Sequence, residues 1–469
     1  MKKTTFLTIF VCVLAIFAVY TLQTIADQHP SETKQNLNFE NNWHHWRGPH
    51  VTGAAVNANP PTTWSETENI RWKVRIPGMG HATPIIWENT IYIQTAIKGE
   101  KPEVKEEVEE KESADFNPFS GFLNQEQRRG RGNDRNAVPY KFNIMALNRS
   151  NGDVLWEKTL REVVPHEGIH NTASFASNSP VTDGEHIYAY FGSRGLYCLD
   201  MKGNIKWEKD IGQMRKRNTF GEGSCPIIHG NTIVIVQDHE GPSFIVALDK
   251  RTGDELWKMD RNERTTWTSP IVVEHGGKAQ VIVPATNRSR SYDLETGEVL
   301  WECGGMTGNV IPSPLYADGL VYLISGFRGA AMQAVILANA TGDITGSEEA
   351  IAWEYDENTP YVPSPLLHGN IIYFLKGDNI ISAVDRKTGE LLFGPIRING
   401  IRGIYASIVG AADRVYVASR NGAVAVIQHG PEFEVLATNT LEDSFNASPA
   451  IVGSELYLRG SEYLYCIAE

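Results

Sequence analysis

Cysteine is scarce in this sequence, with 5 among 469 residues. No two cysteines are adjacent or form a C-x-x-C pair, which excludes a vicinal disulfide and a thioredoxin-like redox motif. Beyond Cys12 there are Cys198, Cys225, Cys303 and Cys466, and they stand far apart. Cys198 and Cys466 occupy matching places in GLYCLD and YLYCIA. We therefore predict free thiols that serve as small buried hydrophobic residues.

The usual catalytic motifs are also absent. The sequence has no G-x-S-x-G elbow, no phosphate-binding P-loop and no D-x-D-x-D calcium loop, and the letters H-E-x-x-H occur at 166–170 in a stretch that falls in a loop. His166, His170 and His239 are candidate acid–base groups only because they fall in loops, and we interpret them as exposed surface histidines. Glu222 and Asp238 could lie near a binding face, but nothing marks them as a metal-bound set. The sequence thus predicts no catalytic and no metal site.

Basic residues are too few for nucleic-acid binding. Lys and Arg number 43 against 56 Asp and Glu, a formal net charge of −13, whereas binding to phosphates needs a basic surface. We interpret the acidity as a contribution to solubility.

One long apolar run is present, from Phe6 to Tyr20, after Lys2 and Lys3. It is shorter than the roughly 20 residues of a membrane span, and the small-residue stretch ending at Ala26 follows it. Residues 1–26 are therefore predicted to be a signal peptide, with an uncleaved inner-membrane anchor as the alternative. No lipobox accompanies Cys12, so we predict no lipoprotein. The protein is expected in the periplasm or cell envelope.

A polar lead-in, residues 27–68, precedes the repeats. It contains the stretch WHHWRGP at 43–49. Two adjacent histidines without a further ligand nearby are weak evidence for a metal site, so we interpret the stretch as a packed aromatic collar.

What the sequence has in abundance is repetition. A Ser/Thr-Pro pair, or a close variant, precedes an apolar strand about every 45 residues, the spacing of propeller blades. The pairs begin at Thr83, Ser179, Cys225, Ser269, Ser313, Ser364, Ser407 and Ser448. Eight such positions predict an all-β, eight-bladed β-propeller of four-stranded antiparallel blades.

Each repeat also carries a turn and an aromatic residue, as in ALDKRTGDELW at 247–257. The Gly supplies the positive φ of a tight turn, and the ring suits packing between layers. The docking aromatics are Trp72, Trp156, Trp207, Trp257, Trp301, Trp353 and Phe393.

The two chain ends each hold part of one repeat. The last repeat stops at Cys466–Glu469 without its turn and Trp, and residues 68–72 (ENIRW) supply that piece. The sequence predicts that the N-terminal strand completes the last blade and closes a propeller spanning 69–469. Residues 98–139 have no strand pattern and form a low-complexity charged insertion in blade one.

The ALDxxTGxxxW turn resembles the tryptophan-docking motif of the pyrroloquinoline-quinone-like (PQQ-like) propeller superfamily. The opening WHHWRGP…WSETENIRWKV…GHATPII is similar to bacterial PQQ-binding-like repeat proteins. That superfamily contains quinoprotein dehydrogenases, which use a vicinal disulfide, calcium and an Asp base, and non-catalytic scaffolds such as BamB. Because the disulfide and calcium motifs are absent, the resemblance favours the BamB-like scaffold branch without a cofactor. A PQQ- and calcium-dependent dehydrogenase is the alternative.

Binding residues are expected on the face that carries two kinds of loop. One kind joins strands two and three of a blade, and the other joins the outer strand of a blade to the inner strand of the next blade. Two outer-to-inner loops are unusually long and contain His170 with Asn171, and Arg217. Arginines recur in the other loops, at Arg194, Arg288, Arg328, Arg420 and Arg459. Together they are predicted to ring the channel mouth and to bind carboxylate, sulfate or phosphate groups.

Small polar groups face the axis at Thr83, Ser179, Ser224 and their counterparts, which we attribute to a narrow channel. The sequence therefore predicts a monomeric, non-catalytic binding or assembly module of the bacterial cell envelope. Its partner would be an envelope protein, with an anionic polysaccharide as a further alternative.

Overall fold

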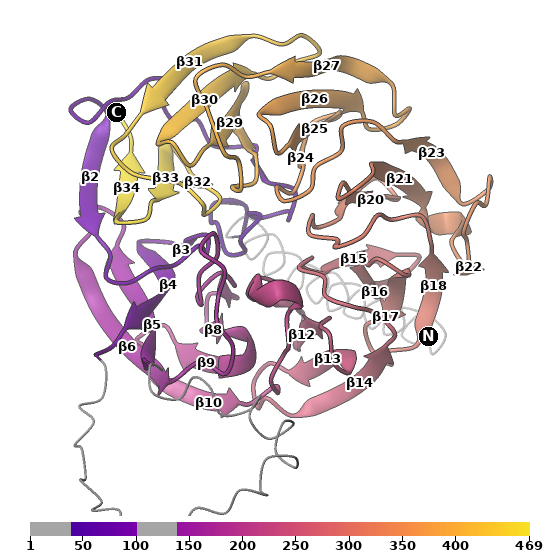
Figure 1. Ribbon diagram of the computed structural model, residues 1–469, viewed down its shortest axis with the longest axis horizontal. Helices are drawn as coiled ribbons and strands as arrows, with labels where there is room; N and C mark the ends of the chain where they lie inside the picture. The colour runs from indigo at the N-terminus through magenta and orange to yellow at the C-terminus, as the bar shows by residue number, and fades with distance from the viewer. Residues whose placement is uncertain (1–38, 101–137) are drawn as a thin grey trace, which may run out of the picture.

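The computed structural model describes residues 39–100 and 138–469, and the predicted signal segment and most of the insertion lie outside these residues. Eight four-stranded antiparallel blades form a ring around a central axis, as predicted (Figure 1). Short 3₁₀ turns are η2 (Gly192–Arg194), η3 (Arg217–Thr219) and η4 (Leu337–Asn339). No helix in the described part of the chain is long and apolar enough to cross a membrane.

The first four blades follow one another in chain order. Their strands, from the axis outward, are β3 (Ile85–Trp87), β4 (Thr90–Lys98), β5 (Tyr140–Asn148) and β6 (Val154–Val163); β7 (Val181–Thr182), β8 (His186–Tyr190), β9 (Leu196–Asp200) and β10 (Ile205–Lys209); β11 (Ile227–His229), β12 (Thr232–Gln237), β13 (Ser243–Asp249) and β14 (Glu255–Arg261); β15 (Ile271–His275), β16 (Lys278–Val283), β17 (Ser289–Asp293) and β18 (Val299–Cys303).

The other four blades complete the ring. Their strands are β19 (Leu315–Ala317), β20 (Leu320–Ser325), β21 (Ala331–Ile336) and β23 (Ile351–Tyr355); β24 (Leu366–His368), β25 (Ile371–Lys376), β26 (Ile380–Asp385) and β27 (Leu391–Arg397); β28 (Val409–Ala411), β29 (Arg414–Ala418), β30 (Ala423–Gln428) and β31 (Val435–Thr440); β32 (Ala450–Val452), β33 (Glu455–Arg459), β34 (Tyr463–Ile467) and β2 (Ile70–Arg75).

The N-terminal strand closes the ring, as the split repeat predicted. β2 pairs antiparallel with β34, and Trp72 lies opposite Cys466 in the register. Two short strands add to blade edges in parallel: β1 (Ala54–Ala55) on β28 and β22 (Gly342–Asp343) on β18. The turn of the fifth repeat departs from the pattern, with Thr341-Gly342 followed late by Trp353, because it covers the outer edge of blade four.

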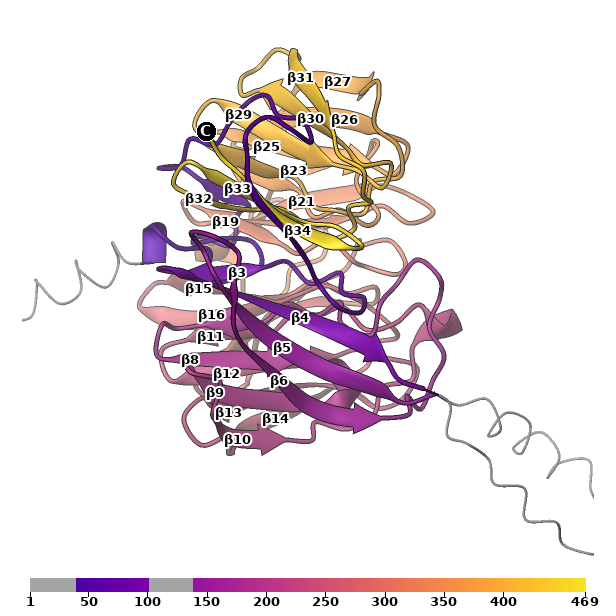
Figure 2. The ribbon, with the colours of Figure 1, turned by 90° about the vertical axis from the view of Figure 1, so that its left-hand side faces the viewer.

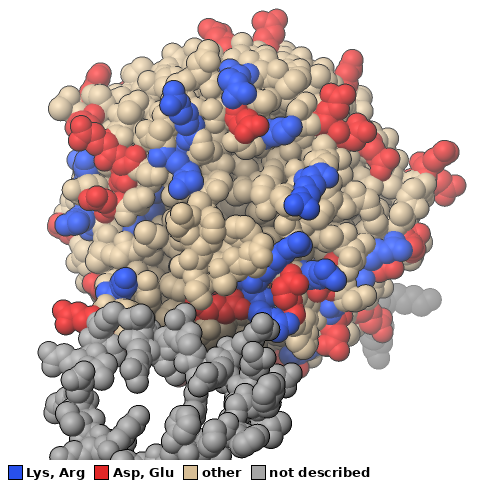
Figure 3. All heavy atoms as spheres, in the orientation of Figure 1, with Lys and Arg blue, Asp and Glu red and all other residues tan. Residues whose placement is uncertain are grey.

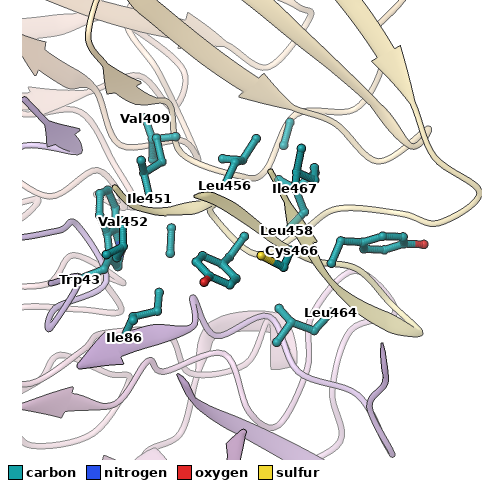
Figure 4. Close-up of a cluster of buried hydrophobic side chains, with 14 of the residues drawn as sticks. Trp43, Ile86, Val409, Ile451, Val452, Leu456, Leu458, Leu464, Cys466 and Ile467 are labelled. Atoms are coloured by element: carbon teal, nitrogen blue, oxygen red, sulfur yellow. The ribbon is translucent and has the colours of Figure 1, made fainter. Parts of the chain in front are cut away.

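The core lies in the seams between neighbouring blades rather than in one central cluster. The largest seam joins blades seven, eight and one with the lead-in and contains Trp43, Ile86, Val452 and Ile467 (Figure 4). Cys198, Cys225, Cys303 and Cys466 are free and buried, as predicted.

The docking Trp of one blade packs on the turn of the next blade. Trp207 Nε1 donates to the carbonyl of Lys250 at 3.0 Å, and its ring lies over Gly253, whose φ is 78°. Trp72, Trp156, Trp257 and Trp353 donate to the next blade in the same way. Trp301 is the exception, since it donates to Gln280 of its own blade.

Replacing Gly253 by Ala is expected to destabilise the protein by about 2–4 kcal/mol, because the positive φ is strained and overpacking adds to it. A Cβ at this position would stand 2.8 Å from Trp207 Cε3. Urea unfolding measures the change. Gly230→Ala is the matched control, because it has a φ of 55° and open space around it, so it isolates the backbone strain. Equal losses for the two variants would contradict the docking role.

The inner strand starts are joined by hydrogen bonds around the axis. At seven of the eight positions, the backbone N–H of the Ser, Thr or Cys before the inner strand donates to the side chain of its counterpart in the next blade, at 2.8–3.2 Å. We call this the inner ring: Thr83, Ser179, Cys225, Ser269, Ser313, Ser364, Ser407 and Ser448. The sequence analysis placed Ser224 here, but Cys225 Sγ takes that place by accepting the N–H of Ser179.

Candidate functional site

The lead-in closes one end of the axial channel. Its backbone pairs with inner strands of blades one and two, where Trp43 bonds Ile86 and His44 O accepts from Thr182 N. Arg47, which is fully buried, donates to carbonyl oxygens of Ile408 and Pro365 between blades six and seven. Because Trp46 lines the axial cavity, the channel is a blind pit, and the predicted aromatic collar is its floor.

Burial also neutralises the two histidines of this segment. It lowers the pKa of His44 to about 4 and the pKa of His45 well below its usual range. His45 Nδ1 accepts the N–H of Arg47. The pair thus serves packing, in agreement with the collar interpretation.

The axial pit has a volume of about 480 Å³ and opens on the opposite face of the disc, which we call the mouth face. Figure 2 shows that β4 and β5 extend toward this face at the ends where residues 98 and 140 lie, whereas the described lead-in begins, in indigo, on the opposite side of the disc. On the mouth face, Lys and Arg side chains lie around the middle and most Asp and Glu side chains lie toward the rim (Figure 3).

Two layers of side chains line the pit. The lower layer is the inner ring. The upper layer comes from the residues two positions earlier, which share the axial side of the chain because extended backbone alternates with a period of two. In blade order these are His81, Ser177, Gly223, Trp267, Ile311, Val362, Tyr405 and Asn446, and all of them line the pit.

The two long loops predicted on this face form one wall of the mouth. The first, residues 164–180, contacts the second, residues 210–226, through His170: its N–H donates to Thr219 O at 2.8 Å and its ring packs on Phe220 with centroids 4.9 Å apart. His166 Nε2 also bonds Met214 O at 2.8 Å. The loops therefore hold each other in place.

Lys216 fixes the second loop to blades three and four. Its ammonium is buried and donates to the carbonyls of Asp238 at 2.7 Å and Thr266 at 3.0 Å. Desolvation by burial lowers the pKa of this lysine to about 8. The neighbouring Arg217 donates its own N–H to Thr265 Oγ1, so its position at the mouth is set before any ligand arrives.

Lys216→Met is expected to loosen this wall, because two buried carbonyls lose their donor, at about 1–3 kcal/mol for each unsatisfied group. Hydrogen–deuterium exchange should become at least about tenfold faster in residues 214–220, since about 1.4 kcal/mol corresponds to a factor of ten. Lys202→Met, at an exposed turn, is the control. Unchanged exchange in both variants would show that Lys216 does not hold the loop.

Of the predicted arginines, Arg217 and Arg328 line the pit. Arg217 Nη1 reaches Asn309 Oδ1 at 3.4 Å, and the Arg328 guanidinium lies 5.2 Å from the ring centroid of Phe327. Phe327 in turn stacks on Tyr361 with centroids 4.7 Å apart. Two of the predicted ring members thus converge at one mouth.

The other predicted residues lie elsewhere. Arg194 is buried in an ion pair with Glu222 at 2.9 Å, and Arg288 bonds Asp343 and Thr345 near the outer edge of blade four. Because both side chains pair with nearby carboxylates and do not line the pit, the prediction that all of these arginines ring the channel mouth is wrong. Arg420 packs 4.9 Å from the ring centroid of Tyr405, and Arg459 is buried beneath the mouth. His170 supports the wall, and the adjacent Asn171 is exposed.

One acid–base candidate, His239, also differs from the expectation of an exposed histidine. His239 is buried, accepts Arg215 N–H at Nδ1 and bonds Pro242 O through Nε2. It is therefore no exposed surface histidine, and burial lowers its pKa. Asp238 is fully buried in an ion pair with Arg261 at 2.7 Å.

Sequence reasoning missed the upper layer and the aromatic mouth. Phe220, Trp267, Tyr361 and Tyr405 line the pit together with Phe327. The signal for Trp267 and Tyr405 was present, because each stands two residues before an inner-ring Ser and must face the same way. Phe220 and Tyr361 lie in loops whose course no periodicity predicts.

A family model confirms the relationship that the docking turns suggested. The model described as PQQ_2, outer membrane protein assembly factor BamB, matches residues 141–302 and 242–469. The chain belongs to this BamB family.

Two curated proteins are distantly similar to the chain. Tetrathionate hydrolase of Acidithiobacillus ferrooxidans is 22% identical over 292 residues, covering 52% of this chain and 56% of that protein. BamB of Shewanella oneidensis is 23% identical over 181 residues, covering 38% of this chain and 42% of that protein. The chain thus spans about half or less of the length of these relatives.

A solved structure of a europium-containing methanol dehydrogenase superposes with a TM-score of 0.59 at 10% identity and covers 90% of each chain. At this identity the likeness shows the propeller fold alone.

The residues that line the pit do not offer the oxygen ligands that a calcium-bound quinone needs. Among the described residues, Glu222 is the one carboxylate that lines the pit, and it is bound by Arg194 Nη1, Ser193 Oγ and Ser193 N. No group of three or more His, Cys, Asp or Glu in the described ranges could hold a metal ion. Calcium prefers six to eight oxygen ligands, several of them carboxylates.

Proposed function

We propose that this BamB-family protein is a non-catalytic binding module of the bacterial cell envelope, which holds a partner on its mouth face. The observation that carries the proposal is the wall built from residues 164–180 and 210–226. These loops interrupt the regularity of the repeat, and the buried ammonium of Lys216 and the backbone hydrogen bond of His170 hold them in place. Rigid loops on a propeller scaffold are the usual place of binding residues.

The name of the Shewanella relative, outer membrane protein assembly factor BamB, supports an assembly partner. We propose a protein of the outer membrane assembly machinery, held by a single propeller in the periplasm. A rigid disc with one elaborated face suits such a scaffold role.

In-cell photo-crosslinking tests this. A photoreactive phenylalanine replaces Phe220 at the mouth or, as a control, Leu256, which is 52% exposed on an outer strand. Crosslinks from position 220, and not from 256, to a component of the outer membrane assembly machinery are expected. Crosslinks from 256 alone would place the partner on the rim and overturn the proposal.

Catalysis is tested separately. Purified protein with added PQQ and calcium should show no dye-linked alcohol oxidation. Turnover with stoichiometric quinone would overturn the non-catalytic assignment and restore the dehydrogenase alternative.

A further inference from the structure

The upper layer of the pit is divided into an apolar half and a polar half. Blades four to seven contribute Trp267, Ile311, Val362 and Tyr405, whereas blades eight to three contribute Asn446, His81, Ser177 and Gly223. Burial, followed by the charges of Arg459 and Arg420, lowers the pKa of His81 to about 4, so its ring is neutral at pH 7. A ligand that fills this layer needs one flat apolar side and one hydrogen-bonding side.

The lower layer presents hydrogen-bond donors. The Oγ atoms of the inner-ring serines accept the N–H of the preceding blade, and a hydroxyl keeps one hydrogen to donate. Ser179 and Ser269 have the Cys225 side chain as a hydrogen-bond partner, whereas among the described residues the hydroxyl hydrogens of Ser364, Ser407 and Ser448 have no acceptor. Ser179, Ser269, Ser364, Ser407 and Ser448 line the pit and are more than nine-tenths buried. Trp46 Nε1 at the floor is buried and has no hydrogen-bond partner in the described part of the chain.

The mouth of the pit is cationic. Arg217 and Arg328 line it, and within the described ranges neither forms an ion pair with a carboxylate. Glu222, the lining carboxylate, is neutralised by Arg194. On a chain with a net charge of −13, this excess of positive charge is local. A guanidinium binds a planar carboxylate through two parallel hydrogen bonds.

These three features fit one ligand class. A sugar ring has an apolar C–H face and an edge rich in oxygen acceptors, and a uronic acid adds the carboxylate that the two arginines lack. The volume of about 480 Å³ lies in the range of small-molecule sites and suits a short chain end of about two sugar rings. We propose that the axial pit binds the terminal sugars of a uronic-acid-containing glycan. This goes beyond the proposed function, because a protein partner on the mouth face does not require a ligand in the pit.

Calorimetric titration of the full chain with tetragalacturonate tests the proposal, with cellotetraose as the uncharged counterpart. Tetragalacturonate is expected to bind, at least about tenfold tighter than cellotetraose, and more weakly as salt rises, because exposed charges are screened. Arg217→Gln and Arg328→Gln should each weaken binding by about tenfold or more, the value of a charged hydrogen bond. The Arg75 side chain on β2 is 76% exposed, so Arg75→Gln should leave binding unchanged.

Three results would overturn it. The first is no binding of tetragalacturonate to a protein whose thermal unfolding is normal. The second is equal affinity in wild type and in both mouth variants. The third is equal or tighter binding of tetraglutamate or benzene-1,3,5-tricarboxylate, which would exclude a sugar as the ligand class. Tyr405→Ala adds a check on the apolar half, since it should weaken tetragalacturonate binding while both arginines remain. Crosslinking from position 220 is scored independently, so failure of either proposal is recognised by itself.

Discussion

Asp238→Asn is expected to lower the free energy of unfolding by about 3–5 kcal/mol, the loss typical of breaking a buried ion pair. Both carboxylate oxygens accept from Arg261, at 2.7 and 3.0 Å, and Oδ2 also accepts from Thr266 Oγ1 at 2.9 Å. The side chains of Asp238 and Arg261 are both fully buried. The amide would leave the guanidinium charged and buried without the carboxylate that hydrogen-bonds it.

Urea unfolding at pH 7.5 measures this change. Glu462→Gln is the control, because its ion pair with Arg75 is long, at 3.9 Å, and both side chains are largely exposed. Such surface pairs contribute about 0–1 kcal/mol. If Asp238→Asn lowers the free energy of unfolding by no more than the control does, the buried network of Asp238 does not support the mouth wall.

Stability is expected to fall steeply as the pH falls from 6.5 toward 4. Burial lowers the pKa of His44 and of His81 to about 4 in the folded protein, against 6.5 in the unfolded chain. The unfolded chain therefore binds more protons in this window, and the stabilisation is complete above pH 6.5 and lost on acidification. Because proton binding and unfolding are linked, each of these two histidines should lower the free energy of unfolding by about 2 kcal/mol between pH 7.5 and 5. His429, whose pKa is also lowered to about 4, acts in the same direction.

Urea titrations at pH 7.5, 6 and 5 follow this loss. In His44→Phe the total change should be smaller by about 2 kcal/mol, because the aromatic ring keeps the contact with Phe39 and no proton is taken up. Equal unfolding free energies at pH 7.5 and 5 in the wild type would contradict the buried, neutral state of these histidines.

The fold could be predicted from the sequence because each blade repeats the same local requirements. The Ser/Thr-Pro start, the tight turn with Gly253 and the docking ring of Trp257 are all local, and the split of the last repeat between Trp72 and Cys466 fixed the closure. Where the repeat was irregular, prediction was harder. The fifth turn added β22 to its neighbour's edge, and Trp301 turned to Gln280 of its own blade.

The site could be predicted only in part. Loop lengths indicated the mouth face, and Arg217 and Arg328 lie at the pit. Arg194 and Arg288 do not, because an arginine reaches several ångströms and pairs with whichever carboxylate the fold brings near, here Glu222 and Asp343. These partners lie 28 and 55 residues away in the chain, so no spacing in the sequence reveals them.

The central claim is that the blind, donor-lined pit on the mouth face is the protein's binding site for an anionic ligand. Crystals soaked in iodide test it most directly, because anomalous scattering locates a bound anion without knowledge of the natural ligand. We expect the strongest ordered iodide between the inner ring and Arg217 or Arg328. An empty pit, with ordered iodide only on the outer strands or on the lead-in face, would contradict the claim.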